Sequence, residues 1–294
     1  MREAMRSLLL SLAALMSTGA RAEAETILFV GNSFTFGANT PVRVMNADRV
    51  TDLNYEGVGE RIGGVPGLFK RFTEQAGLDW QVSLETSGGK TLGWHLAERR
   101  APIDRAWDHV VLQEYSTLDP DRPGDGAATI ADARRIADLL RARNPKVAIT
   151  LSATWTRPDL VFLPGKRWSG TPVATMANDL RRAIDTAARR AKADVAPVGQ
   201  AFTCAIRSGV ADANPYDGID YTRVPLWSYD QYHASSYGYY LEALVVFGRV
   251  TGIDPRTLGA REAAASDLGF SEAETTALQQ TAYDAIATDG GCGR

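Results

Sequence analysis

The chain has 294 residues, with 32 Lys and Arg, 35 Asp and Glu, only three His, and a formal charge of −3. This balance gives no electrostatic reason to bind nucleic acid or anionic lipid. The length is compatible with one large α/β domain, and the sequence contains no internal repeat and no low-complexity linker.

The N-terminus has the three parts of a secretory signal peptide. Two arginines precede an apolar run at 8–15, and small residues follow up to Ala22. The run is too short to span a bilayer, so we expect no stable membrane anchor. We predict a signal peptide over 1–22, with Ala24 as the second choice of cleavage site, and a single exported domain over 23–294. Removing three Arg and one Glu changes the formal charge from −3 to −5, and the product is expected in the periplasm or the medium.

Continuous apolar runs predict strands that are covered on both faces. These runs lie at 26–30, 109–113, 146–153 and 193–199, and a further strand is expected at 80–84. Amphipathic helices are predicted between them at 127–144 and 173–192, the second with a basic face expected to be solvated. The alternation predicts a three-layer α/β/α sandwich with a doubly wound, mainly parallel, flavodoxin-like sheet, and ligands bind such sheets at the carboxyl ends of the strands.

Three segments rich in glycine, proline and aromatic residues are predicted to be long surface loops that could wall a pocket. They cover 54–64, 157–170 and 211–229. Aromatic side chains in or near them could stack on sugars or pack in the core; these are Trp155, Trp168, Trp227, Tyr216, Tyr221 and Tyr229.

Ser33 follows the first predicted strand through Gly31 and Asn32, so it lies where a sheet ends. A serine in this place is either an ordinary turn residue or a nucleophile. A nucleophilic serine needs a base that takes its proton and donors that stabilise the oxyanion that forms.

Asp230 and His233 are three residues apart, which lets the carboxylate accept the imidazole Nδ1 proton and make Nε2 the base. Ser235 or Ser236 is expected to cap the helix that follows. The remaining histidines, at 95 and 109, are expected to be structural.

Two segments that follow strands could supply oxyanion donors. The stretch "LETSGGKTLGW" contains Gly88 and Gly89, and glycine lets a backbone N–H approach a ligand closely. Gln113 ends the 109–113 run, and its side-chain amide is a neutral donor. "SGGKT" is no phosphate-binding loop, because Leu84 occupies the position of the first glycine.

Taken together, these motifs resemble those of the SGNH hydrolases, the GDSL-like esterase superfamily. The similarity covers most of the mature chain and is strongest in "DQYHASSYGYYLEA". It implies that Ser33 is the nucleophile, that His233 is the general base and then acid, and that Asp230 orients His233. It also implies an oxyanion hole made by the backbone N–H groups of Ser33 and Gly89 and by a side-chain amide of a third block.

The chain departs from the family pattern in two blocks. Asn32 stands where the family name has aspartate. The third block lacks Gly-x-Asn-Asp, and Gln113-Glu114-Tyr115-Ser116 is more similar to the Gln-Gly-Glu-Ser block of sialate O-acetylesterase and related carbohydrate esterases. Gln113 is therefore the candidate for the third donor.

The resemblance implies a serine esterase that needs no metal or organic cofactor. The expected substrates are small-molecule or carbohydrate esters with a short acyl group, acetyl above all. A non-catalytic glycan-binding module and an acyltransferase on the same fold are the alternatives.

Cys204 and Cys292 are the only cysteines. An oxidising compartment would let them pair, and two free thiols are the alternative.

Overall fold

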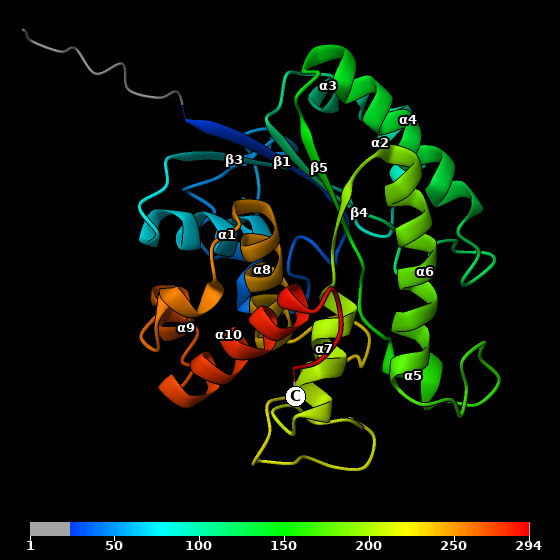
Figure 1. The fold of residues 1–294 in the computed structure, drawn as a ribbon, viewed down its shortest axis with the longest axis vertical. Helices are drawn as coiled ribbons and strands as arrows, with labels where there is room; N and C mark the ends of the chain where they lie inside the picture. Colours follow the sequence, from blue (N-terminus) through cyan, green and yellow to red (C-terminus); the bar gives the residue numbers. More distant parts are fainter. Residues whose placement is uncertain (1–23, 294) are drawn as a thin grey trace, which may run out of the picture.

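Six parallel strands form one sheet at the centre of the protein (Figure 1). The computed structural model describes residues 24–293, so the predicted signal peptide lies outside the described residues. The strands are β1 (Glu25–Gly31), β2 (Thr51–Asp52), β3 (Trp80–Thr86), β4 (His109–Gln113), β5 (Ala148–Ser152) and β6 (Asp194–Ala196). Their spatial order is β2-β3-β1-β4-β5-β6, and every pairing between these strands is parallel. The predicted α/β fold class is confirmed.

The helices cover both faces of the sheet. They are α1 (Gly64–Gln75), α2 (Leu92–Glu98), α3 (Arg100–Ile103), α4 (Ala127–Arg143), α5 (Pro158–Val161), α6 (Ala174–Ala191), α7 (Val198–Arg207), α8 (Ser236–Thr251), α9 (Ala263–Asp267) and α10 (Glu272–Ala287), with 3₁₀ turns η1 (Pro41–Val44) and η2 (Pro255–Leu258). One core lies beneath α1, α7, α8, α9 and α10, and the other beneath α2, α3, α4 and α6 (Figure 1).

Strand β1 explains why the apolar runs are continuous. Ile27 and Phe29 belong to the first core, whereas Leu28 and Val30 belong to the second. Successive side chains of a strand point to opposite faces, so a strand between two helical layers needs apolar residues at every position.

The carboxyl end of β1 is the topological switch point of the sheet. β1 lies between β3 and β4. The chain adds β2 and β3 on one side of β1 and then adds β4, β5 and β6 on the other side. Gly31 pairs with Thr86 at the end of β3, and Val30 pairs with Leu112 near the end of β4. The crevice of such a sheet opens at this point, and Ser33 is two residues beyond it.

The long helices follow the amphipathic pattern closely. The helix expected over 127–144 is α4, and the one expected over 173–192 is α6. Ser235 is the N-cap of α8, and its hydroxyl accepts a hydrogen bond from the Gly238 N–H at 3.2 Å. The cap is therefore the first of the two serines that the sequence offered.

A disulfide joins Cys204 on α7 to Cys292 in the C-terminal tail. The expectation of a bridge is confirmed, and the alternative of two free thiols is wrong. The bond links residues 88 positions apart and holds the glycine-rich tail against α7. Chain-entropy arguments give a loop of this length about 4 to 5 kcal/mol of stabilisation.

Candidate active site

A tight turn presents Ser33 directly after β1. The N–H groups of Thr35 and Phe36 both donate to the Asn32 carbonyl, at 2.9 and 3.1 Å, and close the turn. The Ser33 carbonyl accepts a hydrogen bond from the Tyr239 hydroxyl of α8 at 3.0 Å. Ser33 is 8% exposed, so the residue is buried in the turn and does not lie on an open loop tip.

Glycine is required at position 31 because the turn folds back over it. A Cβ atom there would lie 2.2 Å from Thr35 Oγ1 and 2.8 Å from Gln113 Oε1. Both are polar atoms that hold the turn, so a larger residue would push the nucleophile loop off the sheet.

The Asp230 and His233 side chains form a short hydrogen bond of 2.6 Å between Oδ2 and Nδ1. Asp230 Oδ1 also accepts from the backbone N–H groups of Tyr232 and His233, at 3.1 and 3.0 Å. Asn39, from the loop after Ser33, donates to Asp230 Oδ2 at 2.7 Å. Four donors thus fix the Asp230 carboxylate. Because this carboxylate binds Nδ1 of His233, the Nε2 atom of the same ring is free to act as a base.

These contacts set the charge of Asp230. Partial burial raises the pKa of its carboxyl, but hydrogen bonds from the His233 ring and from the backbone N–H groups of His233 and Tyr232 outweigh burial and leave the pKa below its usual value. Asp230 is therefore ionised at neutral pH and can stabilise an imidazolium on its neighbour.

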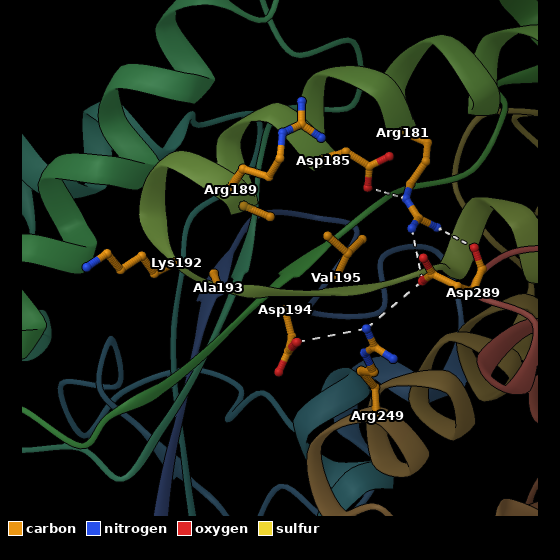
Figure 2. A pocket seen from close by; sticks show the side chains of 10 residues that line it. Arg181, Asp185, Arg189, Lys192, Ala193, Asp194, Val195, Arg249 and Asp289 are labelled. Atoms are coloured by element: carbon orange, nitrogen blue, oxygen red, sulfur yellow. Dashed lines mark hydrogen bonds and ion pairs between the residues drawn. The ribbon is translucent and has the colours of Figure 1, made fainter.

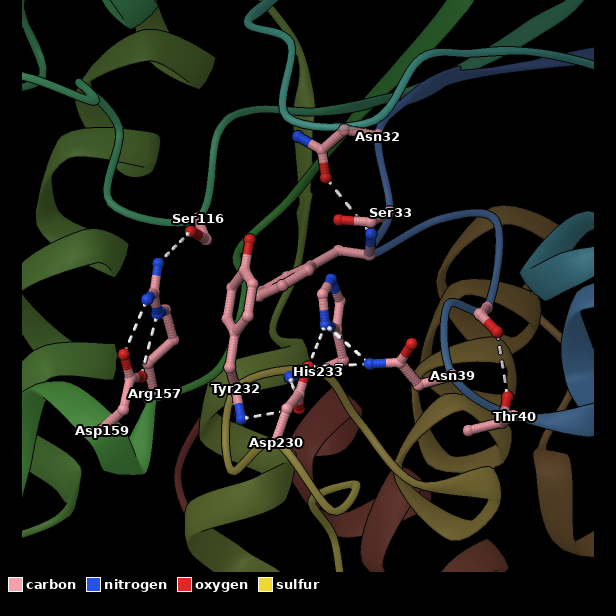
Figure 3. Close-up of polar contacts among 12 residues, drawn as sticks. Asn32, Ser33, Asn39, Thr40, Ser116, Arg157, Asp159, Asp230, Tyr232 and His233 are labelled. Atoms are coloured by element: carbon pink, nitrogen blue, oxygen red, sulfur yellow. Dashed lines mark hydrogen bonds and ion pairs between the residues drawn. The ribbon is translucent and has the colours of Figure 1, made fainter.

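His233 and Ser33 come together although they are 200 positions apart in the chain. Figure 3 shows the free nitrogen of the His233 ring pointing toward Ser33. This Nε2 atom is buried and makes no hydrogen bond with the described residues. The hydrogen bond between the catalytic base and the serine is therefore not formed in this structure, as is common in sites without substrate.

The two backbone N–H groups that the sequence assigns to the oxyanion hole are free of other partners among the described residues. Neither Ser33 nor Gly89 donates its N–H to another described residue. Gly89 has φ of +68°, in the left-handed region that favours glycine. The loop that carries it is held next to the nucleophile turn by Asn32, whose side-chain amide donates to the Lys90 carbonyl at 3.0 Å.

The structure places Gln113 beneath the nucleophile turn. Its Oε1 atom accepts from the Asn32 N–H at 2.9 Å and from the Thr35 hydroxyl at 3.1 Å, and its Nε2 donates to the Glu114 carbonyl. The side chain is 1% exposed. In this arrangement the amide holds the turn in place, and an oxyanion contact from Gln113, which remains a prediction, would require the amide to reorient.

Several site residues were missed by sequence reasoning. Asn39 contacts Asp230, and Arg157 and Ser116 flank Tyr232 on the other side of the dyad (Figure 3). No sequence signal marks Asn39 or Arg157. Tyr232 stands inside the Asp-x-x-His motif, and its position alone could have drawn attention to it.

The aromatic residues of the predicted loops divide into two groups. Trp155, Trp168 and Trp227 are buried, so for these three the structure selects core packing from the two alternatives. Tyr221 and Tyr229 are 90% and 80% exposed. Both line a cavity of about 420 Å³ in the loop 211–229 that leads into Asp230.

A second polar cleft of about 330 Å³ lies at the amino end of β6, away from Ser33 (Figure 2). It includes Arg181, for which the expectation of a solvated outer face is wrong. The Arg181 side chain is 12% exposed and forms ion pairs with Asp185 at 2.6 Å and Asp289 at 3.0 Å. The Arg181 guanidinium in this cleft is therefore already paired with two carboxylates of the protein.

Comparison with solved structures places this fold among known ones. A proposed SGNH hydrolase from Slackia heliotrinireducens is 21% identical, with a TM-score of 0.51 over 77% of this chain and 99% of its own. A DUF4886 family protein from Bacteroides uniformis is 16% identical, with a TM-score of 0.58 over 92% and 98%. An acetyl xylan esterase is 14% identical, with a TM-score of 0.53 over 76% and 99%.

The chain has the fold of the SGNH hydrolases. The resemblance found in the sequence is confirmed at this level, because the similar structures are SGNH hydrolases and esterases with the same arrangement of sheet and helices. No family model and no curated protein matches the sequence. Among the described residues, no helix is both long and apolar enough to cross a membrane.

Proposed function

We propose that the protein is an exported serine esterase that hydrolyses carboxylic esters through an acyl-enzyme. The observation that carries the proposal is the Asp230–His233 pair, whose unpaired Nε2 points to Ser33 at the switch point of the sheet (Figure 3). A binding module has no need for an oriented base beside a buried serine hydroxyl.

The reaction follows from this geometry. His233 Nε2 takes the Ser33 proton as the serine oxygen attacks the ester carbonyl, and the oxyanion accepts hydrogen bonds from the Ser33 and Gly89 N–H groups. The imidazolium, stabilised by Asp230, then gives the proton to the leaving alcohol. Water repeats the sequence on the acyl-enzyme, with His233 as the base, and releases the acid.

Short acyl groups on a carbohydrate are the proposed substrates, acetyl above all. The third block, Gln113 to Ser116, is similar to that of carbohydrate esterases, and one solved structure with this fold is an acetyl xylan esterase. The cavity lined by the loop 211–229 adds support, because the exposed Tyr221 and Tyr229 rings can stack on a sugar while the carboxylates of the lining bind its hydroxyl groups.

The first test is hydrolysis of p-nitrophenyl acetate, butyrate and octanoate by the protein from residue 23 onward. Wild type is expected to be active on the short esters, and Ser33→Ala is expected to be inactive. Ser208→Ala, an exposed serine at the end of α7, is the matched control and should keep wild-type activity. Equal inactivity of wild type and Ser33→Ala, with both proteins folded, would contradict the esterase proposal and leave sugar binding or acyl transfer to be tested.

Export is the second part of the proposal, and it is supported by the N-terminal sequence. The full-length gene product should be recovered outside the cytoplasm with an intact mass that begins at residue 23. A cytoplasmic product that retains residues 1–22 would contradict it.

A further inference from the structure

Tyr232 lies inside the candidate active site, next to the dyad that its own loop provides. Its ring centroid is 4.0 Å from that of His233 and 5.5 Å from that of Phe34, the residue after the nucleophile. Figure 3 shows its hydroxyl pointing into the space between Ser33 and Ser116. The phenol therefore faces the place where an ester carbonyl must sit to be attacked by Ser33.

Arg157 fixes this ring from the other side. Its guanidinium carbon lies 3.8 Å from the centroid of the Tyr232 ring, and its Nη1 donates to the Ser116 hydroxyl at 3.1 Å. Asp159 binds the same guanidinium at two points, at 3.0 and 2.7 Å, which holds it in one orientation. A cation over the ring polarises the phenol and makes its O–H a stronger donor.

The N–H groups of Ser33 and Gly89 donate to no other described residue. The Gln113 amide accepts from the Asn32 N–H and donates to the Glu114 carbonyl. We propose that the Tyr232 hydroxyl donates the third hydrogen bond to the oxyanion formed when Ser33 attacks the ester. This inference rests on the proposed esterase function and adds a catalytic residue to it.

The protonation state of Tyr232 fits this role. Burial raises the pKa of the phenol above its usual value, although the positive charge of Arg157 and hydrogen bonding to Ser33 and Ser116 act in the opposite direction. The hydroxyl keeps its proton at neutral pH. It stabilises the oxyanion by a hydrogen bond alone, and the only proton that moves travels between Ser33, His233 and the leaving alcohol.

Tyr232→Phe tests the inference because it removes the hydroxyl and keeps the ring between Arg157 and His233. We expect kcat for p-nitrophenyl acetate to fall by about 10²-fold to 10³-fold with little change in KM, the usual effect of losing one oxyanion donor. Inhibition by phenylboronic acid, which forms a tetrahedral adduct with the serine oxygen, should weaken by a similar factor. Tyr283→Phe, which makes the same change on α10, is the matched control. It should behave as wild type.

A second measurement covers the case in which Tyr232→Phe fails to fold. With 3,5-difluorotyrosine at position 232 the phenol ionises at a much lower pH, and an ionised phenol cannot donate. The alkaline fall in kcat should then move into the neutral range, whereas a purely structural role would leave the pH profile unchanged.

The outcomes separate the two proposals. If wild type is active, Ser33→Ala is inactive and Tyr232→Phe keeps kcat within about twofold of wild type, this inference is wrong and the esterase proposal stands. An unmoved pH profile of the fluorinated protein would overturn it in the same way. If wild type and Ser33→Ala are equally inert, both proposals fail.

Discussion

The candidate site and the polar cleft of Figure 2 are both rich in charged residues, yet their chemistry differs. In the cleft, Arg181 is paired with Asp185 and Asp289, and Arg249 lies 3.9 Å from Asp194. In the candidate site, the His233 Nε2 atom and the N–H groups of Ser33 and Gly89 have no hydrogen-bond partner among the described residues. Charge density therefore does not distinguish the two regions. What distinguishes them is whether donors and bases have been left available for a ligand.

The difference has a topological cause. The cleft lies at the amino end of β6, where side chains of α6, α8 and the C-terminal tail meet and neutralise one another. The candidate site lies where β1 ends between β3 and β4, and there the loops diverge and cannot fill the space with their own partners.

The largest expected effect comes from removing the base. His233→Ala should lower kcat for p-nitrophenyl acetate by about 10⁴-fold or more. Without the imidazole, no base accepts the Ser33 proton and no acid protonates the leaving alcohol. His109→Ala is the control, since His109 lies at the opposite end of the sheet and pairs with Glu25 at 3.4 Å. Comparable losses in the two variants would mean that the site has been misplaced.

A smaller effect is expected in the pH dependence of stability. Burial raises the pKa of Glu114, at the site end of β4, to about 7, although the backbone N–H groups of Tyr115 and Leu92 oppose the shift. The folded state then binds a proton that the unfolded state has lost, so the free energy of unfolding falls as pH rises from about 4.5 to about 7. The contribution of Glu114 is roughly 3 kcal/mol.

Glu114→Gln removes the titrating carboxyl group. The free energy of unfolding of this variant should therefore fall by roughly 3 kcal/mol less than that of wild type as pH rises. Urea unfolding of both proteins at about pH 5 and about pH 8 measures the difference. Parallel losses of stability in wild type and variant over this range would show that Glu114 does not titrate there.

The smallest effect is expected in the cleft. Arg249→Gln removes loose ion pairs of 3.9 and 4.0 Å from a side chain that is 28% exposed. Esterase activity should stay within about twofold of wild type, and the free energy of unfolding should change by less than about 1 kcal/mol. A tenfold loss of activity with unchanged stability would show that the cleft contributes to catalysis. The two regions would then not differ in the way stated above.

The local features of this protein could be predicted from the order of its residues. The apolar run of β1, the glycine at position 31, the spacing of Asp230 and His233 and the cap at Ser235 all depend on neighbours within a few residues. Such patterns are dictated by backbone geometry and by burial on two faces, which a reader of the sequence can recognise. The alternation of strands and helices predicted a parallel sheet, and a parallel sheet brings the carboxyl ends that carry Ser33, Gly89 and Gln113 to one edge.

Only the tertiary structure decided what these side chains contact. Asn39 reaches Asp230 across 191 positions, and the Gln113 side-chain oxygen accepts a hydrogen bond from the Asn32 N–H of the nucleophile turn. The burial of Trp155 and the placement of Tyr232 beside Arg157 were decided in the same way. The physical reason is that an amide or an aromatic ring can satisfy its hydrogen bonds and its apolar surface in several places, and the packing of distant segments selects one of them.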